Sequence, residues 1–344
     1  MEKLNIDKVA QLAHVSRSVV SRVLNNHPNV SEEARERVMK VVIEHNYKPN
    51  TIARNLATQS SKQIGVLTSR IGEESLGNGY WSLLYLGIFE ECIRRGYYVH
   101  LSFYSASMKK ELYDLILNEH NLDGVICLNE EVTEFTAKTF SEIDMPIVVV
   151  GHNPAYPEIS SVDIDNHKGA YKGVKHLVDH GHIKIGGIFG DQNVEETKHR
   201  IKGYEDAQSD HGIDVDKGLI SVSSYSQKDG YQTMNKWLGL HPELTAVFCA
   251  SDTLAMGAML ALHERNIKIP EEFSVVGFDG LPISRYMIPP LTTVAQPTYG
   301  KGEKAAKMLI DRINKKETEI VHQNLEPELI IRKSCAPAPV KARF

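Results

Sequence analysis

The sequence lacks any uninterrupted apolar stretch of the ~20 residues that a helix needs to cross a bilayer. Its first fifteen residues, MEKLNIDKVAQLAHV, also lack the continuous apolar segment of a secretory signal. The chain has 344 residues, of which 42% are hydrophobic, enough for a sizeable core. We therefore expect a soluble, cytoplasmic protein of two or three domains.

Cysteine is scarce. The four cysteines are far apart and show neither metal-ligand spacing nor a dense disulfide pattern; they are Cys92, Cys127, Cys249 and Cys335. This favours structural thiols in a reducing compartment.

Signatures of catalysis are missing as well. The first strand pattern is followed by TSRIG at 68–72 instead of G-x-G-x-x-G, and no P-loop, Ser/His/Asp set or paired carboxylates stand out. His176, His180 and His182 surround Gly181 near a helix end, where local capping explains them better than metal ligation. The sequence therefore predicts a protein that is not an enzyme and has no metal and no cofactor.

Charge is unevenly distributed. The whole chain has a net charge of -5, but residues 1–62 contain ten Lys/Arg and six Asp/Glu, a net of +4, which leaves -9 for the remainder. Attraction to nucleic acid depends on the phosphates neutralised locally. A basic head on an acidic body thus indicates that only the head contacts DNA.

The first sixty residues are predicted to be helical. Asn5, Ser16 and Ser31 are suitable N-caps for helices that begin at Ile6, Arg17 and residue 32. The first two helices are short and joined by a tight turn, which is the helix-turn-helix pattern. Pro49 ends this part of the chain.

From Ile64 the pattern changes to an alternation of short β-branched strands and amphipathic helices, which indicates an α/β fold with buried parallel sheets. The predicted strands are Ile64–Thr68, Tyr97–Phe103, Gly124–Leu128, Pro146–Val150, Ile185–Phe189, Ala246–Ala250 and Ser274–Phe278. The pattern restarts near Ser161, so we expect two doubly wound subdomains with a ligand cleft beyond the carboxyl ends of their strands.

The expected organisation is a DNA-binding head (1–48), a hinge helix and linker (49–62), an effector-binding core (63–335) and a tail (336–344). Within the core we expect an N-subdomain of about 63–161 and 291–320, and a C-subdomain of about 162–290 and 321–335. The tail, from Cys335 onward with its Pro-Ala-Pro, is predicted to be disordered.

Ordered motifs along the whole chain resemble those of the LacI/GalR family of repressors. In the head they are VAxLAxVSxxxVSRVLN from Val9, VS from Val30, YxPN from Tyr47 and ARxLA from Ala53. In the body they are GGI from Gly186, RxxGY from Arg200, SDxxAxG from Ser251, VVGFD from Val275 and PPLTTV from Pro289. The resemblance implies a helix-turn-helix head on a periplasmic-binding-protein-like core.

The resemblance places the second helix in the major groove of DNA, with its N-terminal side chains at base edges. Arginine suits bidentate bonding to guanine, so Arg17 and Arg22 are expected to specify sequence together with Ser18. Ser16, Ser21 and Asn25 are expected to bond phosphates or cap helices. The family usually has threonine where this chain has Val19.

The hinge residues that the resemblance implicates in DNA binding are Asn50, Ala53, Arg54 and Leu56. Residues 50–57 are too few for a stable isolated helix, so we expect them to fold on DNA. Two copies of Leu56 would wedge into a central minor-groove step and kink the duplex. This arrangement requires a homodimer on a near-palindromic operator. No apolar heptads follow Ile331 to support a tail-mediated tetramer.

For the effector, the resemblance points to residues from several segments of the body. Arg200 supplies a planar fork of donors and Asp279 an acceptor, the pair that sugar hydroxyls need. Aromatic faces are expected from Tyr80, Trp81 and Tyr225. The weaker candidates are Ser69, Ser251 and, because Gly151 replaces a polar residue common in the family, His152.

A sugar or sugar derivative is the first choice of effector, and a purine or another metabolite is the main alternative. A solute-binding protein shares the core fold, but it would carry a secretory signal and no DNA-reading head. The sequence leaves open whether the effector is an inducer or a corepressor, and which operator is read. A phosphocarrier-protein partner is possible in the family, but nothing local supports it here.

Overall fold

The computed structural model describes residues 4–24, 27–47, 60–68, 79–103, 122–128, 145–151, 156–316 and 319–340. The chain divides into two compact units, residues 1–62 and 63–344. No helix of the described ranges is long and apolar enough to span a membrane.

The described residues of the head form three helices, and their caps confirm the prediction. The side chain of Asn5 accepts a hydrogen bond from the Lys8 amide at 2.8 Å, and Ser16 and Ser31 cap the next two helices in the same way. The helices are α1 (Ile6–Leu12), α2 (Arg17–Leu24) and α3 (Glu32–Glu44). One small core joins them, made of Val9, Ala10, Ala13, Val20, Val23, Val38 and Val41.

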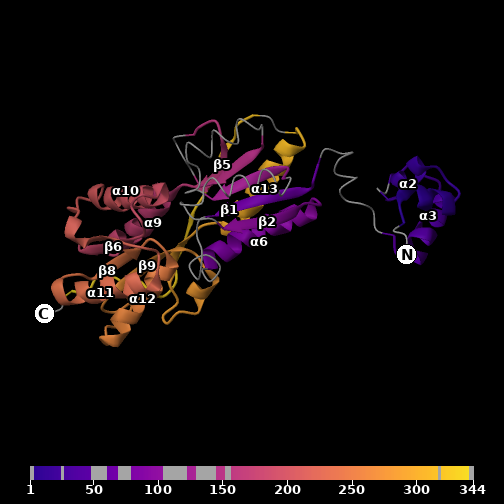
Figure 1. The fold of residues 1–344 in the computed structure, drawn as a ribbon. Helices are drawn as coiled ribbons and strands as arrows, with labels where there is room; N and C mark the ends of the chain where they lie inside the picture. The colour runs from indigo at the N-terminus through magenta and orange to yellow at the C-terminus, as the bar shows by residue number, and fades with distance from the viewer. Residues whose placement is uncertain are drawn as a thin grey trace. The chain divides into compact units, whose positions relative to one another are not determined.

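The body contains two six-stranded sheets in which every described pairing but one is parallel (Figure 1). In the first sheet, the strands are β1 (Gln63–Thr68), β2 (Tyr98–Phe103), β3 (Gly124–Leu128), β4 (Ile147–Val150), β5 (Ser160–Ile164) and β11 (His322–Leu325), in the order β11-β5-β4-β3-β1-β2. In the second, they are β6 (Ile185–Phe189), β7 (Ile220–Val222), β8 (Ala246–Cys249), β9 (Ser274–Asp279), β10 (Thr292–Ala295) and β12 (Glu328–Ile330), in the order β12-β10-β9-β8-β6-β7. The predicted α/β fold with two parallel sheets is confirmed.

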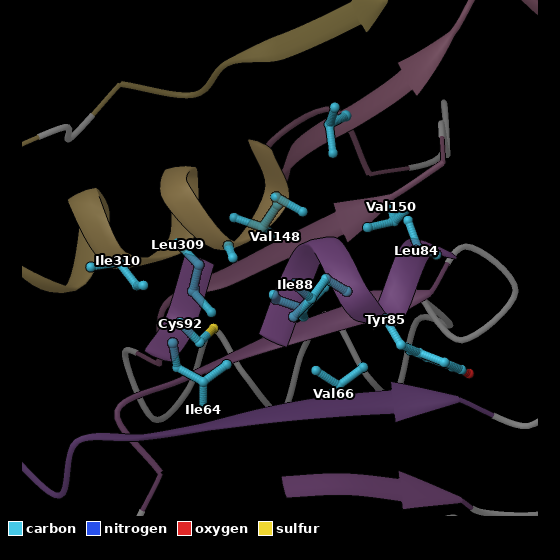
Figure 2. Close-up of a cluster of buried hydrophobic side chains, with 14 of the residues drawn as sticks. Ile64, Val66, Leu84, Tyr85, Ile88, Cys92, Val148, Val150, Leu309 and Ile310 are labelled. Carbon is cyan, nitrogen blue, oxygen red and sulfur yellow. The ribbon is translucent and has the colours of Figure 1, made fainter. Parts of the chain in front are cut away.

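Helices α6 (Gly79–Arg94) and α13 (Thr298–Ile313) cover one face of the first sheet. Figure 2 shows their apolar side chains converging on those of the strands. The two helices touch backbone to backbone: a Cβ added to Gly302 would lie 2.2 Å from the Leu84 carbonyl oxygen, and one added to Gly87 would lie 2.1 Å from that of Tyr299. Glycine is therefore required where α6 and α13 cross.

The second sheet packs between two helix pairs. These are α9 (Asn166–Asp179) with α10 (Glu195–Ser209), and α11 (Gln227–Leu240) with α12 (Asp252–Glu264). The core on the first pair includes Tyr204, Phe248 and Phe278, and that on the second includes Trp237 and Phe273. These cores hold the carboxyl ends of β6, β8 and β9 in place.

The expected subdomain boundaries are wrong at two places. Strand β10 lies in the range expected for the first subdomain, but it pairs with β9 of the second sheet, with Thr292 opposite Val276. Strand β11 lies in segment 321–335, which is expected in the second subdomain, but it pairs with β5 of the first sheet, with His322 opposite Ser161. The chain reaches β10 from β9 without an α-helix, so the alternation of strands and helices gave no sign of this strand.

The described part of the tail, residues 336–340, is held by hydrogen bonds, contrary to the prediction of disorder. The Ala336 amide donates to the Ser274 hydroxyl at 3.1 Å, and the Ala338 amide donates to the His180 carbonyl at 2.8 Å. The buried ring of His182 also contacts the Ala336 carbonyl at 3.1 Å. These backbone bonds hold a segment whose composition alone suggested disorder.

Candidate nucleic-acid interface and ligand site

Helix α2 presents a polar face. Val20 and Val23 are buried in the core of the head, whereas Arg17, Ser18 and Arg22 are exposed. The three residues predicted to read bases therefore share the solvent side of one helix. Ser21 is half-buried.

The start of this helix is held by short polar contacts. The Ser16 hydroxyl lies 2.8 Å from that of Ser18 and accepts from the Val19 amide at 3.4 Å, so it acts as the N-cap. Arg17 lies 3.7 Å from Asp7, with 68% of its side chain exposed. An ion pair this exposed contributes little, so Arg17 is available to another acceptor.

Several predicted site residues lie outside the described residues. They are Asn25, Asn50, Ala53, Arg54, Leu56, Ser69 and His152.

Arg200 is anchored in the interior of the body. Its Nε donates to Asn166 Oδ1 at 2.8 Å and its Nη1 to the Ala250 carbonyl at 2.7 Å, while its guanidinium lies 3.9 Å over the ring centroid of Phe278. Nη2 has no hydrogen-bond acceptor among the described residues. These two hydrogen bonds orient the guanidinium and leave Nη2 as a donor for a ligand.

Asp279 faces this arginine from the carboxyl end of β9. Its Oδ1 lies 4.0 Å from Arg200 Nη1, too far for a hydrogen bond, and accepts from Gln296 Nε2 at 2.6 Å. Burial raises the pKa of Asp279 to about 6 although the Arg200 charge lowers it. The backbone φ of Asp279 is 106°, a conformation that costs energy in a non-glycine residue. The Asp279 carboxylate also accepts a hydrogen bond from the Asp252 backbone, which lowers its pKa.

A second charged pair lies near the first. Lys301, on α13, donates to Asp163 Oδ1 at 3.3 Å and to Gln296 Oε1 at 3.5 Å, and its ammonium lies 5.3 Å from the ring centroid of Tyr80. Burial alone would lower the pKa of Lys301, but Tyr80 and Asp163 outweigh it and raise this pKa. Because the Gln296 amide touches both pairs, Arg200 and Lys301 belong to one polar site.

Glu196 also belongs to this group. It is half-buried in the first turn of α10, and burial, reinforced by the Asp163 charge, raises its pKa to about 7. The charges of Lys301 and Arg200 act in the opposite direction.

The structure therefore brings together Tyr80, Tyr225, Arg200 and Asp279 as the resemblance implies. Tyr225 places its hydroxyl 2.8 Å from that of Thr197, and its ring lies against the Cα of Gly190, where an added Cβ would be 2.0 Å away. Trp81 packs on the hydrophobic core below α6, with its ring 5.0 Å from that of Tyr80. The Ser251 hydroxyl is the N-cap of α12, accepting from Leu254 at 3.0 Å.

Sequence reasoning missed several polar members of the site. They are Asp163, Asn166, Glu196, Gln296 and Lys301. One available signal was the spacing of Glu196 and Arg200, four residues apart on one helix face. Another was the polar pair Asp163 and Asn166 beside an apolar run. No cluster of three or more potential metal ligands occurs among the described residues.

Comparison with known proteins agrees with this arrangement. The family model described as bacterial regulatory proteins of the lacI family matches residues 5–50, and the periplasmic binding protein-like domain matches residues 174–335. The HTH-type transcriptional regulator RegA of Clostridium saccharobutylicum is 35% identical over 333 residues, which cover 96% of this chain and 98% of RegA. The HTH-type transcriptional repressor PurR of Mannheimia succiniciproducens is 32% identical with the same coverage.

Solved structures are similar along the whole chain. The lac repressor dimer bound to operator and the anti-inducer ONPF has a TM-score of 0.84 and 27% identity, covering 97% of this chain and 100% of that one. The complex of transcriptional regulator CelR with cellobiose has a TM-score of 0.75 and 29% identity, covering 96% and 99%. These proteins are regulators and not enzymes. With its DNA-binding head and binding-protein-like core, this chain belongs to the LacI family of bacterial transcriptional regulators.

Proposed function

We propose that the protein is a cytoplasmic repressor that binds a near-palindromic operator as a homodimer, and that a sugar bound at Arg200 and Asp279 sets its affinity for DNA. The sugar assignment rests on the hydrogen-bonding groups that Arg200 and Asp279 still offer to a ligand. Arg200 Nη2 offers a donor that the described residues do not use, and the Asp279 carboxylate beside it has lone pairs for a further hydrogen bond. Adjacent hydroxyls of a sugar can satisfy both at once.

Two similar structures with bound sugars support this effector class. CelR was solved with cellobiose, and a LacI family regulator of Enterococcus faecium, 27% identical to this chain, with bound ribose. A purine is the competing effector, and it would need a ring face to stack on.

An exposed apolar segment supports the homodimer. Ile283, Tyr286 and Ile288 are 47%, 78% and 94% exposed within six residues. Apolar side chains gathered at the surface mark interaction sites. The two hinge segments that would carry Leu56 also need to lie side by side on DNA, which a dimer provides.

Communication between the two sites follows from differential binding. If a sugar binds one arrangement of the core better, and that arrangement changes hinge pairing, then the sugar changes operator affinity, and DNA changes sugar affinity by the same factor. A sugar that lowers operator affinity is an inducer, and one that raises it is a corepressor.

Fluorescence anisotropy tests the proposal. Purified full-length protein is titrated with near-palindromic duplexes selected from random sequence, at two salt concentrations, with cellobiose and ribose as the first sugars. We expect tight, selective binding that a sugar changes and that Leu56→Ala weakens. Weak binding that is equal for every duplex and abolished by salt would contradict it.

A further inference from the structure

We infer that the buried ion pair of Asp163 and Lys301 is a positioning element of the effector site. It orients Arg200 and Asp279, each by way of one amide side chain that lies between that residue and the pair. This inference rests on the proposed function and deepens it, because it names residues that set the affinity for the sugar without contacting it.

The ion pair joins the first sheet to a helix that covers it. Asp163 is on β5 and Lys301 on α13, both are buried, and Lys301 Nζ lies 3.3 Å from Asp163 Oδ1. The backbone amide of Lys301 donates to the Pro297 carbonyl at 2.8 Å, and the next residue, Gly302, lies where α13 crosses α6. The backbone that carries the ammonium is thus held in place by the packing of the two helices.

The amide of Asn166 connects the ion pair to Arg200. Its Nδ2 donates to Asp163 Oδ2 at 3.2 Å, and its Oδ1 accepts from Arg200 Nε at 2.8 Å. The Ile164 carbonyl is a second, longer acceptor for Nδ2, at 3.4 Å. An ionised carboxylate only accepts and a guanidinium only donates, so these neighbours favour a single orientation of the amide. Asp163 therefore orients the acceptor that holds Arg200 Nε.

The amide of Gln296 connects the ion pair to Asp279. Its Nε2 donates to Asp279 Oδ1 at 2.6 Å, and its Oε1 lies 3.5 Å from Lys301 Nζ. This second distance is long for a hydrogen bond, but a buried ammonium still attracts a carbonyl dipole there because the local dielectric is low. With the amide reversed, its oxygen would face the Asp279 carboxylate and its NH₂ group would face the ammonium. Lys301 therefore orients one of the donors that hold Asp279.

The two paths start from one ion pair and end on two side chains that face each other, since Arg200 Nη1 lies 4.0 Å from Asp279 Oδ1. The residues of this network, which are the ion pair, the two amides and these two side chains, are at most 7% exposed. Hydrogen bonds shielded from water are stronger than exposed ones, so a buried network orients its side chains rigidly. Because a binding site needs its groups held within about 0.5 Å, removing the ion pair should weaken sugar binding.

Removing both charges at once tests this inference. Asp163→Asn combined with Lys301→Met nearly preserves the size of both side chains and leaves neither charge buried without its partner. The full chain is titrated with cellobiose and with ribose by isothermal titration calorimetry. For a sugar that the wild type binds, we expect the affinity to fall about tenfold, the effect of one or two weakened hydrogen bonds, with operator binding retained in the absence of sugar.

The matched control removes an ion pair at the other end of α13. Arg95 Nη1 lies 2.7 Å from Asp311 Oδ1, and Glu91, which Arg95 also contacts, keeps its contact with Arg94. Arg95→Met combined with Asp311→Asn should therefore leave the affinity for the sugar unchanged.

A second measurement needs no sugar. In protein labelled with ¹⁵N-arginine, the Arg200 Nε–H signal, assigned with Arg200→Lys, reports the bond to Asn166. We expect hydrogen exchange of this group to be about tenfold faster in the variant without the ion pair. In Gln296→Leu the exchange should stay as in the wild type while sugar affinity falls, because only the path to Asp279 is cut.

The outcomes separate this inference from the proposed function. Unchanged Arg200 Nε–H exchange or unchanged sugar affinity in the variant without the ion pair would overturn the positioning role. If its loss of affinity and that of Gln296→Leu multiply in the combined variant, Lys301 contacts the sugar itself and does not act through Gln296. If neither sugar binds a wild type that still recognises its operator, the sugar effector is wrong, and the exchange measurement alone decides whether the ion pair positions Arg200.

Discussion

The carboxylate of Asp252 accepts a hydrogen bond from the Leu281 amide at 2.7 Å, and so ties the start of α12 to the turn that follows Asp279. The Thr293 hydroxyl donates to its other oxygen at 2.6 Å. Asp252 is fully buried, and these bonds hold β9, β10 and α12 together at the edge of the site. The position of Asp279 thus depends on the buried side chain of Asp252.

Asp252 should make stability depend on pH. Burial, followed by the Asp279 charge, raises its pKa from 3.8 to about 8, against the opposing effect of Arg332. Between these values the folded state binds more protons than the unfolded chain, so the contribution of Asp252 to the free energy of unfolding falls as pH rises. In Asp252→Asn this contribution is absent, and its stability relative to the wild type should improve from pH 4 to about 8.

Urea denaturation across this range measures the effect. The variant also loses an acceptor for one buried donor, a cost of about 1–3 kcal/mol that is constant with pH. If the free energies of unfolding of the wild type and the variant change with pH in parallel, then the pKa of Asp252 is not raised.

The crossing of α6 and α13 should be intolerant of a single methyl group. Gly302→Ala would place its Cβ 2.2 Å from the Leu84 carbonyl oxygen, so the helices must separate, at a cost of about 1–3 kcal/mol. Gly239→Ala in α11 is the control, because no atom lies within 4 Å of the added Cβ. There, alanine should stabilise the helix by about 0.5–1 kcal/mol. Thermal unfolding of both variants gives the comparison, and equal shifts would argue against close packing at Gly302.

The head and most strands could be predicted from local sequence, because caps and β-branched runs are local signals. Strand β5 could not. Its sequence SSVDI is polar yet fully buried, since Ser161 bonds to His322 and Ser160 accepts from the Val321 amide. These partners lie about 160 residues further along the chain, beyond the reach of any local pattern.

The sequence also predicted only part of the candidate site. Arg200 and Asp279 belong to motifs that resemble a family, so they were found. Lys301 lies in an amphipathic helix whose composition permits a surface lysine, and only the crossing of α13 over α6 brings it to Asp163 and Tyr80. Sequence reasoning therefore identified one charged pair and missed the other.

Arg200→Lys should separate ligand binding from DNA binding. Lysine retains the charge beside Asp279, but its donors all lie on one nitrogen and do not reproduce the planar guanidinium that bonds Asn166 and Ala250 through separate nitrogens. Losing a charged hydrogen bond costs about 1.5–3 kcal/mol, so we expect sugar affinity to fall about tenfold to a hundredfold, with operator binding retained in the absence of sugar. Arg265→Lys is the control, since Arg265 makes a similar forked contact to Asn235 on the surface. If both variants bind the sugar as the wild type does, Arg200 is not a ligand contact.

On α2, Arg22→Ala should relax sequence selectivity, because an exposed arginine that bonds guanine bidentately discriminates bases by about 1–3 kcal/mol. Arg37→Ala on the exposed face of α3 removes the same charge elsewhere in the head. If Arg37 adds only general attraction, its loss should weaken every duplex equally and reduce the salt dependence. Anisotropy with the selected duplex and single-base variants distinguishes these effects. A uniform loss for Arg22→Ala as well would mean that Arg22 contacts phosphate, and that the base-reading side chains of α2 lie nearer its N-terminus, at Arg17 and Ser18.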